Sequence, residues 1–300
     1  MAHIIAIANQ KGGVGKTTTS VNLSSCLAKA GRKTLLIDMD PQGNATSGLG
    51  IDKNILPFTV YDLLLDHSQP ISQIMLNPLL KNLFLVPSNI QLIGAEFELL
   101  SSPEKEFRLQ KALSSINDSF DYIIIDSPPS LGLITINILT AASFLLVPVQ
   151  CEYYALEGLS LLMETIRRVR GSFNPKLHLL GLLITMYDTR TNLSRQVTED
   201  VRKHFGNLVF NTIIPRNVRL SEAPSFGKPI ILYDQKSAGA EYYGKFSAEL
   251  LSKLEKPDVA IPNSKPVPNS QVDNTIGSII PSQEVSVNVE EKESGIGQGA

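Results

Sequence analysis

The residues best suited to chemistry lie near the N-terminus, where residues 10–18 have the sequence QKGGVGKTT between an apolar run and a helical pattern. Closely spaced glycines let successive backbone N–H groups turn inward around an anion, and the positive end of a following helix adds to that field. Lys16 could then reach the β- and γ-phosphates of a nucleotide, and the Thr17 hydroxyl could ligate Mg²⁺. Gln10 stands where the standard phosphate loop has its first glycine, so the standard motif is not met. The spacing still predicts a phosphate-binding loop made of Lys11, Gly12, Gly13, Val14, Gly15, Lys16, Thr17 and Thr18.

Acidic residues follow two other apolar runs. Thr34–Ile37 is followed by Asp38 and Asp40, and Tyr122–Ile125 is followed by Asp126. Ligand-binding groups of open α/β sheets gather at the carboxyl ends of the strands. Downstream of a phosphate loop, Asp126 fits the Walker B pattern, in which a carboxylate holds Mg²⁺, usually through water. Asp38 and Asp40 project to the same side of an extended segment and could serve the waters of Mg²⁺ and the attacking water. For Asp38, a structural role at the turn stays open beside the metal role.

These residues need a scaffold, and the first 256 residues supply one by alternating short apolar runs with longer amphipathic ones. The apolar runs are typical of strands buried on both faces: Ile4–Ala8, Thr34–Ile37, Leu83–Val86, Tyr122–Ile125, Phe144–Val149, Leu179–Ile184 and Val209–Ile214. The segments between them predict helices at Lys16–Ala30, Glu104–Ile116, Leu131–Ala142, Leu156–Arg170, Leu193–Phe205 and Ala240–Leu254. Such alternation predicts an α/β protein with a mostly parallel, twisted sheet covered by helices on both faces.

The composition changes at Pro257. Residues 257–300 are rich in Pro and Ser, contain six acidic and two basic residues, and lack aromatic residues, which predicts a disordered acidic tail. The domain that contains the phosphate loop is then expected to span residues 1–256. The two cysteines, Cys26 and Cys151, are too few for a disulfide framework and do not form a metal-binding pair, so packing explains them better. No apolar stretch approaches the length of a membrane-spanning helix, so we expect a cytoplasmic protein that does not bind membranes.

Lys11 makes the loop more specific. The segment Lys11–Thr18 resembles the deviant Walker A motif of the ParA, MinD and nitrogenase-iron-protein group of P-loop NTPases. The resemblance implies a homodimer that forms on binding ATP and Mg²⁺, in which Lys11 reaches the partner's nucleotide while Lys16 serves its own. Residues 40–44, DPQGN, resemble the switch of ParA-type ATPases, which implies that Asp40 positions or activates the attacking water. Ser127-Pro128-Pro129 resembles the switch after Walker B, which senses the γ-phosphate.

Later segments, YDTRT at residues 187–191 and IPRNVRLSEAP at residues 214–224, resemble the ParA/Soj partitioning proteins in particular. The resemblance covers about residues 3–254 and implies an adenine pocket formed by Met186, Pro215 and Asn217. It also implies a nucleoid-associated protein whose ATP-bound dimer binds double-stranded DNA without sequence preference, and whose hydrolysis a ParB-type partner stimulates. The implied DNA-binding residues are Arg190 and Arg219, to which Arg216, Lys203 and Lys228 could add.

Two other functions use the same motifs. A MinD-like or cluster-positioning ATPase would act on a protein cargo, although MinD-type proteins anchor to membranes through a basic amphipathic C-terminal helix and this C-terminal segment is acidic. A metabolic ligase or synthetase on the same scaffold, such as a dethiobiotin-synthetase-like enzyme, is disfavoured by the segments after Tyr187. The sequence does not identify the cargo, the partner protein, or whether the system belongs to a chromosome or a plasmid.

Overall fold

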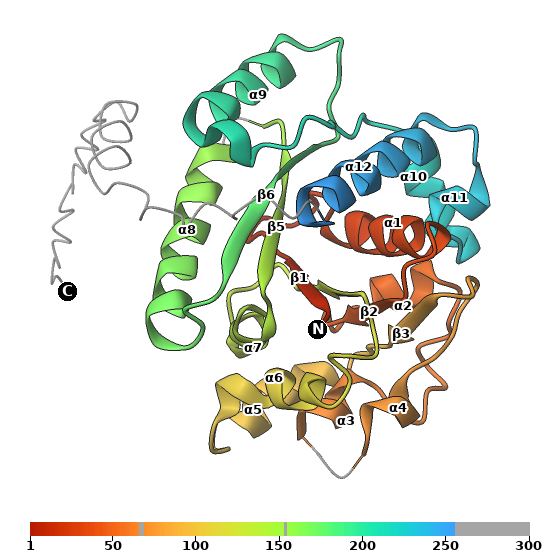
Figure 1. Cartoon of the computed structure of the whole chain (residues 1–300), viewed down its shortest axis with the longest axis vertical. Coiled ribbons are helices and arrows are strands. Elements are labelled where there is room, and N and C mark those ends of the chain that lie inside the picture. The colour runs from red at the N-terminus through yellow and green to blue at the C-terminus, as the bar shows by residue number, and fades with distance from the viewer. Residues whose placement is uncertain (66–68, 153–154, 256–300) are drawn as a thin grey trace, which may run out of the picture. The chain divides into compact units, whose positions relative to one another are not determined.

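A single parallel sheet organises the protein. The computed structural model describes residues 1–65, 69–152 and 155–255. Six strands lie in the order β3-β2-β4-β1-β5-β6, and every neighbouring pair is parallel (Figure 1). Their bounds are β1 His3–Ile7, β2 Thr34–Asp38, β3 Leu83–Val86, β4 Tyr122–Asp126, β5 Phe144–Gln150 and β6 His178–Thr185. The predicted α/β architecture is therefore confirmed.

Alternate side chains of the strands enter two separate apolar cores, one on each face of the sheet. On β1, Ile5 and Ile7 enter one core, whereas Ile4 and Ala6 enter the other. This follows from the two-residue period of a strand, and it explains why the strand sequences are apolar almost without interruption. The first core lies under α1 Lys16–Lys29, α2 Asn44–Gly48, α10 Val218–Glu222, α11 Ile230–Tyr233 and α12 Ala238–Glu255.

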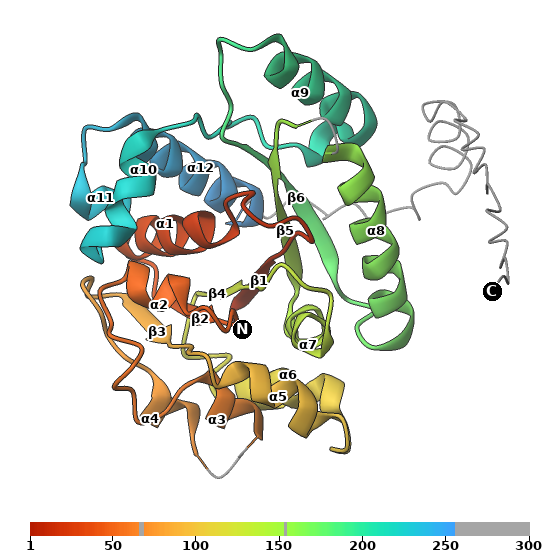
Figure 2. The same cartoon turned by 180° about the vertical axis from the view of Figure 1, so that it is seen from behind.

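The second core lies under the helices of the opposite face. These helices are α3 Val60–Leu65, α4 Ile71–Ile74, α5 Leu92–Leu99, α6 Arg108–Ser114, α7 Leu133–Ala141, α8 Ala155–Ser172 and α9 Asn192–Phe205. Figures 1 and 2 show α7 and α8 on the other side of the sheet from α1 and α12. Short 3₁₀ turns occur at Lys105–Phe107, Gly206–Leu208 and Ala223–Phe226. Because the sheet is parallel, the loops that follow the strands meet at one edge, and the predicted phosphate-loop and acidic residues lie at the strand ends, on those loops or in the first turn of α1.

The prediction of a seventh strand at Val209–Ile214 is wrong, because this segment forms no strand of the sheet. The segment runs beside β6 and bonds to it near both ends, since Phe210 N donates to Leu182 O at 2.9 Å and Ile214 N donates to Ile184 O at 2.9 Å. Between these points the backbone N–H groups of residues 211 and 212 donate instead to the carboxylate of Glu249 on α12. The Glu249 carboxylate thus replaces the hydrogen bonds of a strand pair in the polar middle of residues 209–214.

Three other predictions concern the two cysteines, membrane-spanning helices and the C-terminal tail. Both cysteines are buried and free, as packing residues should be. No helix within the described residues has the length and apolar character needed to span a membrane. The expected tail, residues 257–300, lies outside the described residues, so its disorder and its boundary stay predictions.

Candidate nucleotide site

The predicted phosphate loop joins β1 to α1 and is held at both ends by neighbouring strands. Asn9 Nδ2 donates to Pro148 O on β5 at 2.8 Å, and Thr185 Oγ1 on β6 donates to Val14 O at 2.8 Å. Gly13 and Gly15 have φ of 74° and 87°, in the left-handed region that favours glycine. The loop therefore enters α1 with the backbone geometry of an anion-binding turn.

Lys16, the first residue of α1, is buried beneath this loop. Its Nζ donates to Lys11 O at 3.2 Å. Burial lowers the pKa of Lys16, and the negative charges of Asp126 and Asp40 act in the opposite direction. The Lys16 ammonium thus bonds to the loop and interacts with two carboxylates. The phosphates of a bound nucleotide would compete with these groups for the ammonium.

Lys11 lies at the surface of the same loop. Its Nζ forms an ion pair with Glu152, which follows the end of β5, and the two side chains are 35% and 44% exposed. One lysine of the loop is therefore buried within its own subunit, and the other is partly open to solvent. Exposed ion pairs of this kind contribute only about 0–1 kcal/mol, so Lys11 can leave Glu152 at small cost.

Asp126 ends β4 directly opposite Asp38 of β2 in the strand register, and both carboxylates are fully buried. Ser20 Oγ on α1 donates to Asp126 Oδ1 at 2.7 Å, whereas Asp126 Oδ2 has no hydrogen-bond partner among the described residues. Burial raises the pKa of Asp126, the charge of Asp38 raises it further, and the hydroxyls of Ser20 and Thr17 oppose this.

A magnesium ion fits these groups. One oxygen of Asp126 is buried without a hydrogen-bond partner, and the Thr17 hydroxyl acts on the same carboxyl group. A carboxylate and a hydroxyl are oxygen ligands of the kind that Mg²⁺ uses with nucleotide phosphates. Within the described part of the chain, no group of three or more His, Cys, Asp or Glu side chains could hold a metal ion. A cation here would thus share its coordination with phosphate oxygens and water rather than occupy a protein cage.

Asp38 holds the turn after β2. Its Oδ2 accepts hydrogen bonds from Thr46 N at 2.8 Å and Thr46 Oγ1 at 2.7 Å, and its Oδ1 accepts one from Asp40 N at 3.2 Å. Burial raises the pKa of Asp38, and the bonds from Thr46 oppose this increase. Of the two roles left open for Asp38, these contacts favour the structural one.

Asp40 lies on the turn that Asp38 organises. Asp40 Oδ1 accepts a hydrogen bond from Gln42 N at 2.9 Å, and Asp40 O accepts one from Gly43 N at 2.9 Å. Gly43 has φ of 59°, and a Cβ there would lie 2.7 Å from Ser88 O. The turn is therefore closely packed, with the Asp40 carboxylate near Lys16 at the carboxyl edge of the sheet.

The segment after β4 also reaches the phosphate loop. Ser127 Oγ donates to Ile7 O at 2.9 Å, and Pro129 Cβ lies 4.0 Å from the point that a Cβ on Gly12 would occupy. The structure thus brings this predicted switch beside the first glycine of the loop.

Of the three predicted adenine-pocket residues, Met186 lies against the loop and Pro215 pairs with the residue that follows Met186. Met186 follows β6 with an unusual φ of 51°, and its Cε lies 3.7 Å from the point that a Cβ on Gly15 would occupy. Pro215 pairs with Tyr187 in an isolated parallel bridge. Asn217 caps α10, where its Oδ1 accepts Leu220 N at 3.3 Å, so only its amide nitrogen is free of that bond. The assignment of these residues to adenine stays a prediction.

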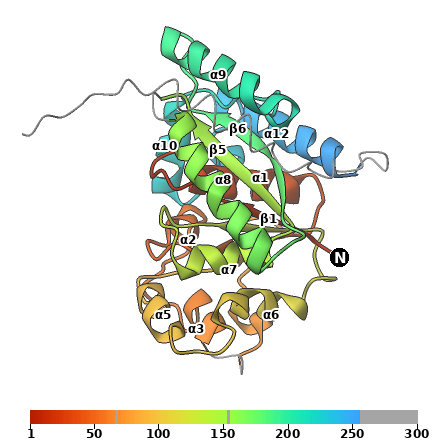
Figure 3. The same cartoon turned by 90° about the vertical axis from the view of Figure 1, so that its left-hand side faces the viewer.

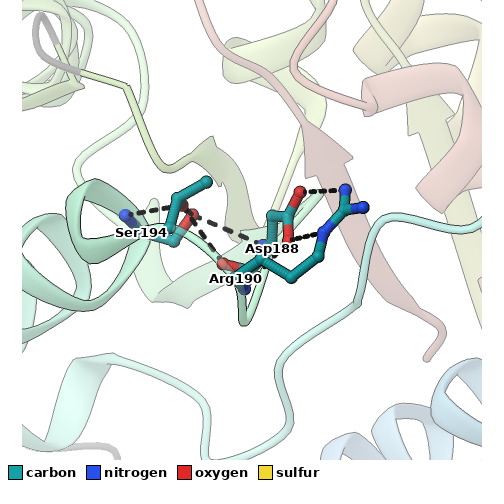
Figure 4. Close-up of polar contacts among 4 residues, drawn as sticks. Asp188, Arg190 and Ser194 are labelled. Carbon is teal, nitrogen blue, oxygen red and sulfur yellow. Dashed lines mark hydrogen bonds and ion pairs between the residues drawn. The ribbon is translucent and has the colours of Figure 1, made fainter.

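The predicted DNA-binding arginines are exposed but engaged in ion pairs. Arg190 Nε and Nη2 donate to the two oxygens of Asp188 at 2.9 and 2.7 Å (Figure 4). These bonds hold the pKa of Asp188 well below its usual value. Arg219 pairs with Glu222 at 2.8 Å and approaches Asp234 at 3.6 Å. The side chains of Arg216, Lys203 and Lys228 are also exposed.

Three contacts of the site were not predicted from the sequence. Ser20 lies one turn after Lys16 on α1, a spacing that places both on one helix face and could have indicated its contact with Asp126. Glu152 follows the end of β5, so the rule about carboxyl edges could have included it. Nothing in the sequence indicated Thr46, because its hydroxyl joins Asp38 to Ser88 and these residues come together only in the folded protein.

A phosphate-loop turn at the edge of a parallel sheet, a buried lysine, and a buried carboxylate with a free oxygen define a P-loop nucleotide-binding protein. A family model described as an AAA domain matches residues 2–179. The sporulation initiation inhibitor protein Soj of Bacillus subtilis (strain 168) is 57% identical over 250 residues, which cover 83% of this chain and 98% of that protein. The chromosome partitioning protein ParA of Myxococcus xanthus (strain DK1622) is 54% identical over 253 residues, which cover 84% of this chain and 89% of that protein.

A solved structure shares the fold. The structure of cobyrinic acid a,c-diamide synthase from Mycobacterium smegmatis with bound ADP and magnesium matches with a TM-score of 0.75 at 40% identity, over 85% of this chain and 96% of that chain. The chain belongs to the ParA/Soj family of chromosome-partitioning ATPases.

Proposed function

We propose that this protein is a Mg²⁺-dependent ATPase that dimerises on binding ATP, with Lys11 of each subunit contacting the nucleotide of the other. The observation that carries the proposal is the different burial of the two lysines on this one loop. Lys16 is buried against its own loop, while the Lys11 side chain is partly exposed and pairs with Glu152 at the surface. A cation at the surface beside the nucleotide site is available to a second subunit, whereas the buried one is not.

Within each subunit, the described contacts support a role for each side chain. Thr17 and the free oxygen of Asp126 would hold Mg²⁺, which when bound neutralises phosphate charge. Asp40, on the turn fixed by Asp38, would orient the attacking water. The charged groups that act on Lys16 within the described residues are Asp126 and Asp40, and no arginine is among them, so we expect slow turnover without a partner.

The proposed cargo is DNA. The ATP-bound dimer would bind double-stranded DNA without sequence preference through Arg190 and Arg219, and a ParB-type protein would stimulate hydrolysis and release it. This protein would then associate with the nucleoid. Soj and ParA, the relatives at more than half identity, support partition over metabolic synthesis, whereas the synthase structure matches at 40% identity.

A second candidate, an ATPase that positions a protein cargo, is favoured by one observation. Arg190 and Arg219 are each paired with carboxylates of their own subunit, so a DNA phosphate would have to compete with Asp188 and Glu222 for them. DNA binding through these residues therefore requires the ion pairs to open or to share their donors.

Retention on non-specific duplex DNA tests the proposal. We expect binding with ATP and not with ADP, weakened at least tenfold in Arg190→Glu and Arg219→Glu, with a shallower salt dependence because phosphate contacts are lost. Arg168→Glu is the matched control, since Arg168 is also exposed and paired with a carboxylate, Glu164, but lies on α8. If both variants retained DNA as well as the control, the DNA surface would lie elsewhere. ATP-independent retention would contradict the dimer proposal.

A further inference from the structure

A hollow of about 450 Å³ lies between α1 and α12, which are next to one another in two views of the molecule (Figures 1 and 3). Its lining comes from the last turn of α1, from α11 and the turn after it, and from the first half of α12. Binding sites for small molecules have volumes of roughly 300–1,000 Å³. The hollow is therefore large enough for one small molecule, and it lies at the other end of α1 from the phosphate loop.

The hollow has an apolar lining with unfilled space. Ile231 and Ala240 are buried and line it. At Gly244, which also lines it, no heavy atom lies within 4 Å of the point that a Cβ would occupy. At Gly239, earlier on the same helix, a Cβ would lie 2.7 Å from Leu220 Cγ. Helix α12 thus packs closely at one glycine and leaves room at the other, where an apolar group could bind.

The charged residues that line the hollow are Lys29 and Glu241. The Glu241 carboxylate is already engaged, because Lys245 Nζ donates to its Oε1 at 2.6 Å. The Lys29 ammonium is exposed and has no hydrogen bond or ion pair within the part of the chain that the structure describes. An unpaired cation beside a neutral ion pair favours an occupant with a negative charge.

The Cys26 thiol gives a second, independent sign of an incomplete environment. Cys26 lines the hollow, is only 6% exposed, and has no hydrogen-bond partner among the described residues. Burial raises the pKa of Cys26 to about 11, and the positive charge of Lys29 opposes this increase. The thiol is therefore neutral at ordinary pH, and the charge that acts on it from α1 is positive.

We propose that the hollow between α1 and α12 binds a small organic carboxylate, whose apolar body packs on Ile231, Ala240 and Gly244 and whose negative charge pairs with Lys29. Such a ligand would join the end of the helix that begins at the phosphate loop to α12. The inference goes beyond the proposed function, because it concerns neither the nucleotide, the dimer nor DNA.

The probe is naphthalene-2-carboxylate, whose fluorescence anisotropy can be followed with the full chain because the protein contains no tryptophan. A molecule of this size should bind with a Kd of about 1 mM or tighter. We expect Gly244→Leu to lose saturable binding, because the new side chain fills the hollow. Lys29→Gln should bind up to about fivefold more weakly, as the loss of an exposed ion pair implies.

Two controls match these variants. Gly171→Leu should bind the probe like the wild type, because Gly171 lies on α8 and also has no atom within 4 Å of its Cβ position. Naphthalene-2-carboxamide, which lacks the charge, should bind wild type and Lys29→Gln equally. Equal binding of the carboxylate to Gly244→Leu and Gly171→Leu would overturn the site, and equal binding of carboxylate and carboxamide to the wild type would overturn the choice of an anion.

A measurement on the wild type does not depend on the folding of any variant. Naphthalene-2-carboxylate should slow the reaction of Cys26 with N-ethylmaleimide, followed by mass spectrometry of the labelled peptide, and should leave the reaction of Cys151 unchanged. Both thiols are buried, but Cys151 does not line this hollow. Equal protection of both cysteines, or of neither, would contradict the proposal. ATP and DNA are absent from these measurements, so failure of the proposed function would leave this inference untouched.

Discussion

Replacing Thr46 by Val should destabilise the protein more than the loss of one hydroxyl suggests. Thr46 Oγ1 donates to the buried carboxylate of Asp38 and accepts Ser88 N, at 2.7 and 3.0 Å. Losing a hydrogen bond to a charged group costs about 1.5–3 kcal/mol, and leaving a buried N–H without an acceptor costs about 1–3 kcal/mol. Val keeps the shape of Thr and adds apolar contact, so we expect a net loss of about 3–4 kcal/mol.

For a domain of this size, that loss lowers the melting temperature by roughly 6–16 °C. Thr46→Ser is the matched control, because it keeps the hydroxyl and removes one buried methyl group, which costs about 1 kcal/mol. Urea unfolding of the three proteins at one pH, monitored by circular dichroism, measures the difference. If Thr46→Val unfolded within 1 kcal/mol of the wild type, or if Thr46→Ser were equally destabilised, Thr46 would not hold Asp38 as described.

Two other predictions concern the carboxylates of the site. Asp40→Ala should form a long-lived ATP dimer that releases phosphate at least a hundredfold more slowly, measured by size-exclusion chromatography and phosphate release; rapid release would remove Asp40 from the mechanism. Burial raises the pKa of Asp126, so the folded protein keeps this proton to a higher pH than the unfolded chain, and stability should fall as pH rises above the ordinary value of 3.8. Melting temperatures from pH 5 to 8 should therefore fall more steeply in the wild type than in Asp126→Asn, and equal slopes would contradict the burial argument.

The parts of the site that could be predicted from the sequence are those set by contiguous residues or by the end of a single strand. The phosphate loop is contiguous, so its glycines and lysines could be recognised without knowledge of the fold. Asp40 and Asp126 could be placed because any residue after a parallel strand lies at the same edge of the sheet. Six of the seven predicted strands are confirmed, because a strand buried on both faces needs an apolar run and little else.

The sequence could not predict contacts that depend on distant segments. Val209–Ile214 has the composition of a strand, but Glu249 of α12 takes two of its N–H groups, and nothing in the run itself indicates that partner. The ion pair between Lys11 and Glu152 joins residues that only the order of β1 and β5 brings together. Helix α5 was missed because its apolar residues point to both sides, which weakens the amphipathic pattern.

The hydrogen bond from Lys16 to the carbonyl of Lys11 links the two cations of the loop. The Lys16 ammonium has three donor hydrogens, so it can bond a phosphate and the Lys11 carbonyl at the same time. A nucleotide bound at Lys16 would then be connected through one side chain to the backbone that carries Lys11, and under the proposed dimerisation the filling of a subunit's own site would bear on the lysine that it presents to its partner.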